Sequence, residues 1–217
     1  MRGFVIAVDG PAASGKGTIA TQLGAHYGLP VLDTGLLYRA VGVTLAAEGG
    51  DLGDEAAAAA VARRLDPAKL DDPAFRTGAA GEAASQVASH TSVRLALREF
   101  QRAFAGQRGG AVIDGRDIGT VIAPDAPAKL YVTASAEARA RRRWLQLKAA
   151  DPGVAYADVL ADIELRDERD AGRADSPMRP AADAVLLDTT ELTIPAAADA
   201  ARRIVEAARA RWEASRR

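Results

Sequence analysis

The chain contains 217 residues, of which 48% are hydrophobic and 26% are charged, a composition typical of a globular protein that buries one core. Its 28 basic and 29 acidic residues give a net charge of −1, which argues against a broadly basic nucleic-acid-binding surface. The absence of Cys excludes disulfides and cysteine-based zinc sites, and no apolar run is long enough to span a bilayer.

Short apolar runs alternate with helical patterns along most of the chain. The first run, Phe4 to Val8, is closed by Asp9-Gly10 and predicts a strand buried on both faces. Further elements are predicted as strands at 30–33, 111–114, 129–132 and 184–188, and as helices at 15–28, 36–48, 135–149, 155–172 and 195–214. This alternation predicts an α/β fold with a mainly parallel sheet.

The segment from about 51 to 94 interrupts the alternation. It contains the low-complexity run Ala56–Ala60, the breaker pairs Asp66-Pro67 and Asp72-Pro73, and no convincing buried strand. We interpret it as an insertion or small subdomain attached to the sheet. An ordinary helical connection is the alternative interpretation.

A glycine-rich loop lies between the first predicted strand and the first predicted helix. Its sequence is Gly10-Pro11-Ala12-Ala13-Ser14-Gly15-Lys16. In this position a G-x-x-x-x-G-K loop turns backbone N–H groups toward phosphate oxygens, and Lys16 reaches the β- and γ-phosphates. Gly17 replaces the Ser or Thr that often ligates Mg²⁺ there, and Thr18 follows as a possible phosphate donor. We therefore expect no direct protein ligand for Mg²⁺, which the nucleotide phosphates and water would hold.

Two polar clusters follow predicted strands, at the sheet edge where ligands of α/β proteins bind. The first runs from Asp33 to Arg39; Thr34 is either the N-cap of the next helix or a substrate contact, and Arg39 can clamp a phosphate. The second is Asp114-Gly115-Arg116-Asp117. Here Asp114 would orient water around Mg²⁺, Arg116 would bind phosphate, and Asp117 would accept hydrogen bonds from an exocyclic amine.

Two arginine-rich stretches lie on predicted helices. Arg166, Asp170 and Arg173 share one helix face because they are spaced i, i+4 and i+7. Taken alone, a solvated face of salt-bridged pairs is the simpler interpretation. The second stretch, which is either a solvated face or a set of mobile arginines that close over phosphate, comprises Arg139, Arg141, Arg142 and Arg143.

Together these motifs resemble the bacterial cytidylate kinases, the CMP/dCMP kinases among the nucleoside monophosphate kinases. The matching motifs are G-P-x-x-x-G-K-G-T at 10–18, D-[ST]-G-x-x-Y-R at 33–39, A-S-Q-V at 84–87, V-R at 93–94, D-G-R-D-x-G-T-V at 114–121 and R-D-x-R-D-x-x-R at 166–173. The first marks only the superfamily, whereas the last two are specific to this family. The resemblance implies one P-loop NTPase-type domain over 1–217, a three-layer sandwich with a five-stranded sheet. It also implies a monophosphate-binding subdomain inserted at about 51–94 and a lid at about 140–157.

The resemblance further implies ATP-dependent phosphorylation of CMP or dCMP, with Mg²⁺ as cofactor, and assigns a role to each candidate residue. The residues that would read cytosine are Ser85, Arg94 and Asp117. Those that would hold the CMP phosphate are Arg39, Arg116 and Arg166, and those at the ribose and the neighbouring phosphate are Asp170 and Arg173. Thr34 would be a further substrate contact. ATP would be bound by Gly10–Thr18 and Arg142, and the catalytic candidates are Lys16, Arg116 and Arg166.

Three other functions remain as alternatives from the sequence. Another small P-loop kinase would act on UMP, shikimate or dephospho-coenzyme A, but a carboxylate at Asp117 favours the amine of cytosine over O4 of uracil. A GTPase is disfavoured because the chain has no Asn for a guanine-reading N-K-x-D motif, and a binding ATPase lacks a clear h-h-h-h-D-E run. Nucleic-acid binding through the arginines is disfavoured by the net charge. We expect a monomer in the cytoplasm, with no membrane or nucleic-acid partner.

Overall fold

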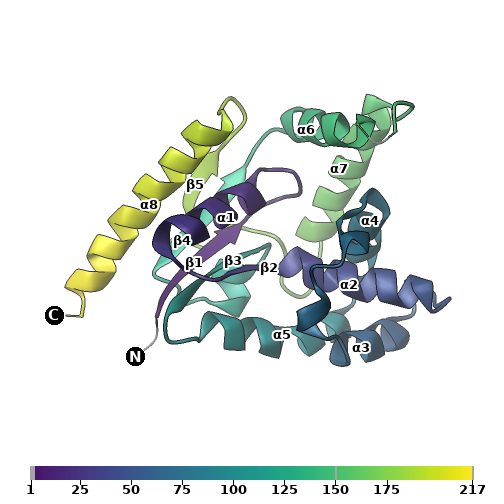
Figure 1. Cartoon of the computed structure of the whole chain (residues 1–217), viewed down its shortest axis with the longest axis horizontal. Coiled ribbons are helices and arrows are strands. Elements are labelled where there is room, and N and C mark those ends of the chain that lie inside the picture. The colour runs from purple at the N-terminus through teal and green to yellow at the C-terminus, as the bar shows by residue number, and fades with distance from the viewer. Residues whose placement is uncertain (1–2, 150, 217) are drawn as a thin grey trace. The chain divides into compact units, whose positions relative to one another are not determined.

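The computed structural model describes residues 3–149 and 151–216, which form a five-stranded parallel sheet with the strand order β2-β3-β1-β4-β5 (Figure 1). The strands are β1 (Phe4–Asp9), β2 (Val31–Asp33), β3 (Gly110–Gly115), β4 (Ala128–Thr133) and β5 (Val185–Asp188). Every residue of β1 and β3 is buried, as expected for central strands covered on both faces. The predicted α/β fold with a parallel sheet is confirmed.

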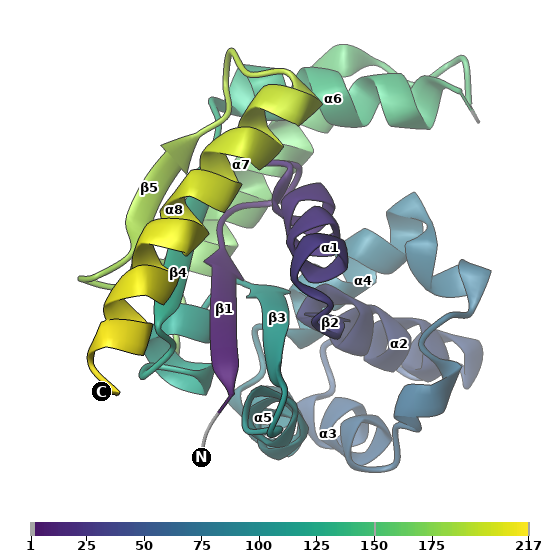
Figure 2. The same ribbon diagram turned by 60° about the vertical axis from the view of Figure 1, so that its left-hand side comes forward.

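Helices that belong to the same compact unit as the sheet are α1 (Lys16–Tyr27), α6 (Ala136–Lys148), α7 (Tyr156–Ala171) and α8 (Ile194–Ala214). Helices α1 and α8 cover one face of the sheet (Figure 2), where Ile6 and Leu130 pack against Leu23 and Val205. A single π-type turn, η3 (Ile118–Ile122), packs against β1. Helices α6 and α7 pack against each other as a hairpin.

The edge strand β5 differs from its prediction. The apolar run 184–188 predicts a buried strand, yet within β5 only Leu187 is buried, and Leu186 is 62% exposed. The difference arises because β5 is an edge strand, which among residues 3–149 and 151–216 pairs with β4 alone. Leu187 points into the core shared with α8, whereas Leu186 points to the opposite face.

Residues 33–103 form a second compact unit, which contains the whole segment 51–94. Its helices are α2 (Thr34–Ala47), α3 (Glu55–Arg63), the 3₁₀ turns η1 (Pro67–Lys69) and η2 (Pro73–Arg76), α4 (Gly78–Val87) and α5 (Thr91–Ala105). Helices α2 and α4 approach so closely that a Cβ at Gly42 would lie 2.8 Å from the Cβ of Ala83. The sequence patterns assign no helix to α3, α4 or α5. Helices α3 and α4 consist largely of Ala and Gly, which leave few bulky apolar residues to mark a buried face. Helix α5 has a clear apolar face that includes the buried Val93 and Leu97, a signal present in the sequence that was missed.

Within the part of the chain that the structure describes, no helix is both long and apolar enough to cross a membrane.

Candidate active site

The phosphate loop joins the carboxyl end of β1 to the first residue of α1. Its backbone has positive φ at Gly10 (148°), Ala13 (59°) and Gly15 (91°). A Cβ at Gly10 would lie 2.0 Å from the carbonyl oxygen of Val132, so a side chain does not fit there. Lys16 Nζ donates to the carbonyl oxygen of Pro11 at 3.3 Å, and its side chain therefore folds back over its own loop.

Ser14 is fully buried in this loop, and its hydroxyl oxygen has no hydrogen-bond partner among residues 3–149 and 151–216. Its carbonyl oxygen accepts a hydrogen bond from Thr189 Oγ1 at 2.9 Å. A buried hydroxyl without a partner costs free energy, and a bound phosphate oxygen would remove this cost by accepting a hydrogen bond from the hydroxyl. The loop is therefore suited to a phosphate ligand.

The Asp114 carboxylate lies at the carboxyl end of β3, beside the start of α1. It is buried, and its Oδ1 lies 3.8 Å from Lys16 Nζ. A Cβ placed on Gly17 would lie 3.2 Å from Asp114 Oδ2, tighter than most contacts of a Cβ. The carboxylate thus crowds the position that Ser or Thr occupies in the common form of the loop, which gives a physical reason for Gly17.

A cavity of about 350 Å³ opens beside the loop. Its walls include Ala13 to Thr18 and Arg142, seven of the ten residues predicted to bind ATP, together with Thr189 and residues at the start of α8. Arg142 donates to Oγ1 and to the carbonyl oxygen of Thr189, so this arginine is held in the cavity wall. Gly10, Pro11 and Ala12 form the loop itself and do not line the cavity.

Asp9, the last residue of β1, fastens the loop that carries the D-G-R-D motif. Its carboxylate oxygens accept hydrogen bonds from the backbone N–H groups of Ile118 and Gly119, at 2.8 and 2.7 Å. Burial raises the pKa of Asp9 to about 7, and the two N–H donors oppose that shift, while Asp117 and Asp114 add to it.

A buried ionic cluster joins the D-G-R-D motif to α7. Arg116 Nε donates to Asp170 Oδ2 at 2.9 Å, and Arg173, just beyond the end of α7, binds Asp170 Oδ1. Burial opposes the ionisation of Asp170, but Arg116, Arg173 and Arg166 outweigh it and hold its pKa below the ordinary value. The expected solvated face is therefore wrong: the ion pairs exist, but they lie inside the protein and involve Arg116.

Arg139 is not part of a solvated face. It is 4% exposed and makes a bidentate ion pair with Asp167, with Nη1 3.1 Å from Oδ1 and Nη2 2.6 Å from Oδ2. It also donates to the carbonyl oxygens of Ala134 and Ala12. Arg139 therefore links α6, α7 and the phosphate loop. Within the expected lid at about 140–157, residue 150 lies outside the described residues.

The remaining substrate candidates belong to the compact unit of residues 33–103. Thr34 is buried at the start of α2, but the N-cap is Asp33, whose carboxylate accepts from the N–H of Gly35 at 2.9 Å. The capping role considered for Thr34 is thus wrong. Arg39 Nη1 lies 3.5 Å from the carbonyl oxygen of Phe75.

Ser85 on α4 and Arg94 on α5 are each 4% exposed. The hydroxyl oxygen of Ser85 has no hydrogen-bond partner within the described ranges, and Arg94 Nη1 donates to the carbonyl oxygen of Ala88 at 2.9 Å. The buried hydroxyl of Ser85 is costly without a partner, and a polar ligand would supply one. Asp117, the third predicted cytosine reader, precedes η3 in the other unit, and its carboxylate does not cap that turn.

Three residues that hold the site together were not among the candidates from the sequence: Asp9, Thr189 and Asp167. Asp9 and Thr189 each follow or end a strand at the carboxyl edge of the sheet, and this placement is a signal that the sequence contains. Thr189 is 2% exposed and binds Ser14 and Thr133. The partnership of Arg139 with Asp167 leaves no local signal, because 28 residues separate them.

Comparisons with known proteins agree with this geometry. The family model described as "Cytidylate kinase" matches residues 6–209. A protein of Caulobacter vibrioides named "Cytidylate kinase" is 66% identical over 209 residues, which cover 96% of this chain and 98% of that protein. The protein of the same name from Caulobacter sp. strain K31 is 64% identical over 209 residues, which cover 96% of this chain and 97% of that protein. An uncharacterized protein from Eubacterium ventriosum, 15% identical, matches 94% of this chain and 98% of its own with a TM-score of 0.56, which supports the fold alone.

Proposed function

This chain belongs to the cytidylate kinase family, and we propose that it transfers the γ-phosphoryl group of ATP to CMP or dCMP, giving ADP and CDP or dCDP. The observation that carries the proposal is the charge around Asp170. Three arginines, Arg116, Arg166 and Arg173, act on one buried carboxylate, and two of them, Arg116 and Arg173, bind it directly. Several guanidinium groups gathered at one place are suited to an anionic ligand, and a nucleotide phosphate is such a ligand.

The transfer needs positioning and charge neutralisation more than covalent chemistry. The N–H groups of the phosphate loop and the N-terminus of α1 would hold the ATP phosphates, and Lys16 would follow the phosphoryl group as it moves. Arg116 and Arg166 would hold the acceptor phosphate, whose oxygen attacks the γ-phosphorus in line as the bond to the ADP oxygen breaks. That oxygen is already anionic, so no general base is required.

Mg²⁺ fits the donor set present. Asp114 is a single buried carboxylate beside Lys16, and among residues 3–149 and 151–216 no group of three or more His, Asp or Glu side chains could hold a metal ion. Mg²⁺ binds through few protein ligands and keeps several waters, so Asp114 would orient that water while the phosphates hold the ion. When bound, Mg²⁺ neutralises charge on the phosphate oxygens.

Base selection would combine Ser85, Arg94 and Asp117. A carboxylate accepts a hydrogen bond from the N4 amine of cytosine, whereas the O4 of uracil would face it with a second acceptor. The buried hydroxyl of Ser85 and the guanidinium of Arg94 would complete the polar contacts that a pyrimidine edge offers. Thr34 and Arg39 would bind the same nucleotide.

The direct test is a coupled assay of purified protein with ATP·Mg and a panel of CMP, dCMP, UMP and AMP. Turnover highest with CMP and dCMP is the expected result. Preferred turnover of UMP or AMP, or ATP hydrolysis that CMP does not change, would contradict the proposal. The monomeric state and cytoplasmic location remain predictions, and light scattering of the purified protein tests the first.

A further inference from the structure

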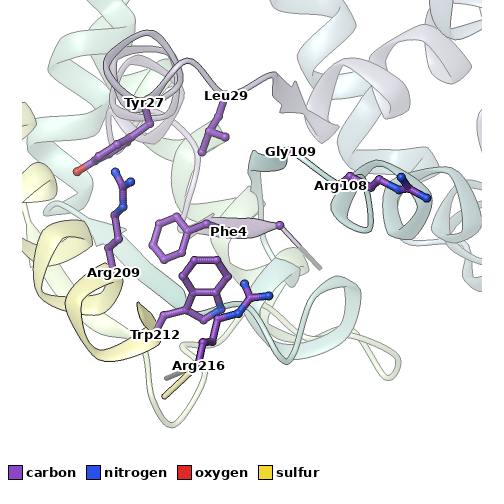
Figure 3. A pocket seen from close by; sticks show the side chains of 9 residues that line it. Phe4, Tyr27, Leu29, Arg108, Gly109, Arg209, Trp212 and Arg216 are labelled. Carbon is purple, nitrogen blue, oxygen red and sulfur yellow. The ribbon is translucent and has the colours of Figure 1, made fainter. Parts of the chain in front are cut away.

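A second cavity lies at the amino end of β1, whereas the phosphate loop follows its carboxyl end (Figure 3). Its volume is about 350 Å³, and none of its lining residues lines the cavity beside the phosphate loop. Phe4 of β1, Tyr27 at the end of α1 and Trp212 of α8 supply three aromatic rings to its walls. The rings of Phe4 and Trp212 pack with centroids 5.3 Å apart and planes tilted by 60°.

Guanidinium groups accompany these rings. Arg216 lies over the ring of Trp212, 4.2 Å from its centroid, and Arg209 lies 5.9 Å from the centroid of Tyr27. Figure 3 shows both between or beside the rings, whereas the side chain of Arg108 extends from the rim away from them. The cavity therefore pairs apolar, flat surfaces with cations held against them.

Two acidic side chains make hydrogen bonds with residues of the cavity. Glu213 accepts from Arg209 Nε at 2.9 Å, and Glu206 accepts from the hydroxyl of Tyr27 at 2.7 Å. The bond to Glu213 uses Nε of Arg209, and the two terminal nitrogens of this guanidinium donate no hydrogen bond to residues 3–149 or 151–216. The terminal nitrogens of Arg209 can therefore donate to an anion that enters the cavity.

We propose that this cavity binds a small planar organic anion, a single ring that bears a phosphate or carboxylate group. The ring would stack among Phe4, Tyr27 and Trp212, and the acidic group would pair with Arg209 and Arg216. A guanidinium group can bind either a phosphate or a carboxylate through two parallel hydrogen bonds, so the cavity would accept a ring that bears either group. Such a ligand would be bound independently of the nucleotides at the phosphate loop.

The fluorescence of Trp212 provides a local readout, because the chain has two tryptophans and the other is Trp144 in α6. Trp144→Phe therefore leaves Trp212 as the sole tryptophan, and its emission is titrated with phenyl phosphate, benzoate and inorganic phosphate. A saturable change with phenyl phosphate or benzoate is expected, and the tighter of the two identifies the source. No saturable change with either, or an equal affinity for inorganic phosphate, would overturn the proposal.

Variants locate the binding. In this background, Arg209→Gln and Arg216→Gln are each expected to weaken binding by about tenfold, since each removes one cation from the cavity. The matched control is Arg211→Gln, an exposed arginine on the same helix that does not line the cavity. Unchanged affinity in both cavity variants would overturn the proposal. So would loss of the signal in Lys16→Ala, because that result would place the binding at the phosphate loop.

Discussion

The Arg116 guanidinium and the Asp170 carboxylate form a largely buried ion pair, with Nε 2.9 Å from Oδ2, between residues 54 positions apart in the chain. The pair joins the carboxyl end of β3 to the last turn of α7. Because Arg173 binds the second oxygen of the same carboxylate, one aspartate orients two arginines. A carboxylate in this position sets the direction of cations that would otherwise repel each other, and so prepares them for a phosphate.

The substitution Asp170→Asn tests this arrangement. Without the carboxylate, Arg116 and Arg173 lose their buried counter-charge, and we expect the free energy of unfolding at pH 7 to fall by about 3 kcal/mol. Urea denaturation followed by circular dichroism measures the change. Asp162→Asn, at an exposed position of the same helix, is the control and should change stability by less than about 0.5 kcal/mol. A loss for Asp170→Asn no larger than for this control would contradict the prediction.

The stability difference between the native sequence and Asp170→Asn should also depend on pH. The pKa of Asp170 lies below its ordinary value of 3.8 in the folded protein, so its ionisation stabilises the fold at all pH values above about 4. That contribution is lost as the pH falls through 3.8 toward the lowered pKa. The stability difference between the native sequence and Asp170→Asn should therefore be constant near neutrality and shrink below pH 4. A difference that grows on acidification would show that the sign is wrong.

Removal of the Lys16 charge should affect the chemical step. We expect Lys16→Ala to lower kcat for CMP by roughly 10²- to 10³-fold, because one positive charge near the transferring phosphoryl group is lost. Steady-state kinetics with saturating ATP·Mg measures kcat, and circular dichroism confirms that the variant folds. Lys69→Ala, which removes an exposed lysine from η1, is the matched control for a lost charge. If kcat of Lys16→Ala stays within a few-fold of the control, Lys16 does not act on the transferring group.

Most of the sheet could be predicted from sequence because its central strands are apolar runs that end in polar residues. The run from Phe4 to Val8 has one plausible conformation, since it is short, partly β-branched and followed by Gly10. The edge strand β5 has the same apolar composition, and only its pairing on one side leaves Leu186 exposed. Whether a strand lies at the edge or in the centre of the sheet depends on the strand order, which the local sequence does not encode.

The candidate site likewise contains residues that a local sequence motif predicts and contacts that depend on the fold. Loop residues such as Lys16 follow from a contiguous motif, and the structure places them in one cavity wall. The ion pairs of Arg139 with Asp167 and of Arg116 with Asp170 join distant segments, so a sequence pattern presents each charge without its partner. For this reason the sequence does not indicate that Arg139 is buried and paired with Asp167.

Base selection gives a prediction for Asp117. We expect Asp117→Ala to lower the ratio of kcat/KM for CMP to that for UMP by at least about tenfold, because the carboxylate no longer favours N4 over O4. The change should appear as a loss with CMP and a smaller loss, or a gain, with UMP. Asp125→Ala, in the exposed turn after η3, is the control and should keep the ratio. An unchanged ratio in Asp117→Ala would assign cytosine recognition to other residues.

Asp9 gives the second pH prediction, of opposite sign to that for Asp170. Its pKa is raised from 3.8 to about 7 in the folded protein, chiefly by burial, so the folded state keeps a proton that the unfolded chain releases above pH 4. Relative to Asp9→Asn, which stays neutral, the native sequence should therefore lose stability as the pH rises from about 4 to about 7. The loss is on the order of 4 kcal/mol over this range.

Urea denaturation of both proteins at several pH values between 4 and 8, without nucleotide, measures this difference. Two opposing effects set the pKa of Asp9. Burial of the charge raises it, and the hydrogen bonds that the N–H groups of Ile118 and Gly119 donate to the carboxylate lower it. Above pH 7 the difference should level off, since Asp9 is then ionised in both folded and unfolded states. If the difference does not depend on pH, the two N–H donors compensate the burial in full. In that case Asp9 is a carboxylate at every pH in this range and fastens the D-G-R-D loop by its charge.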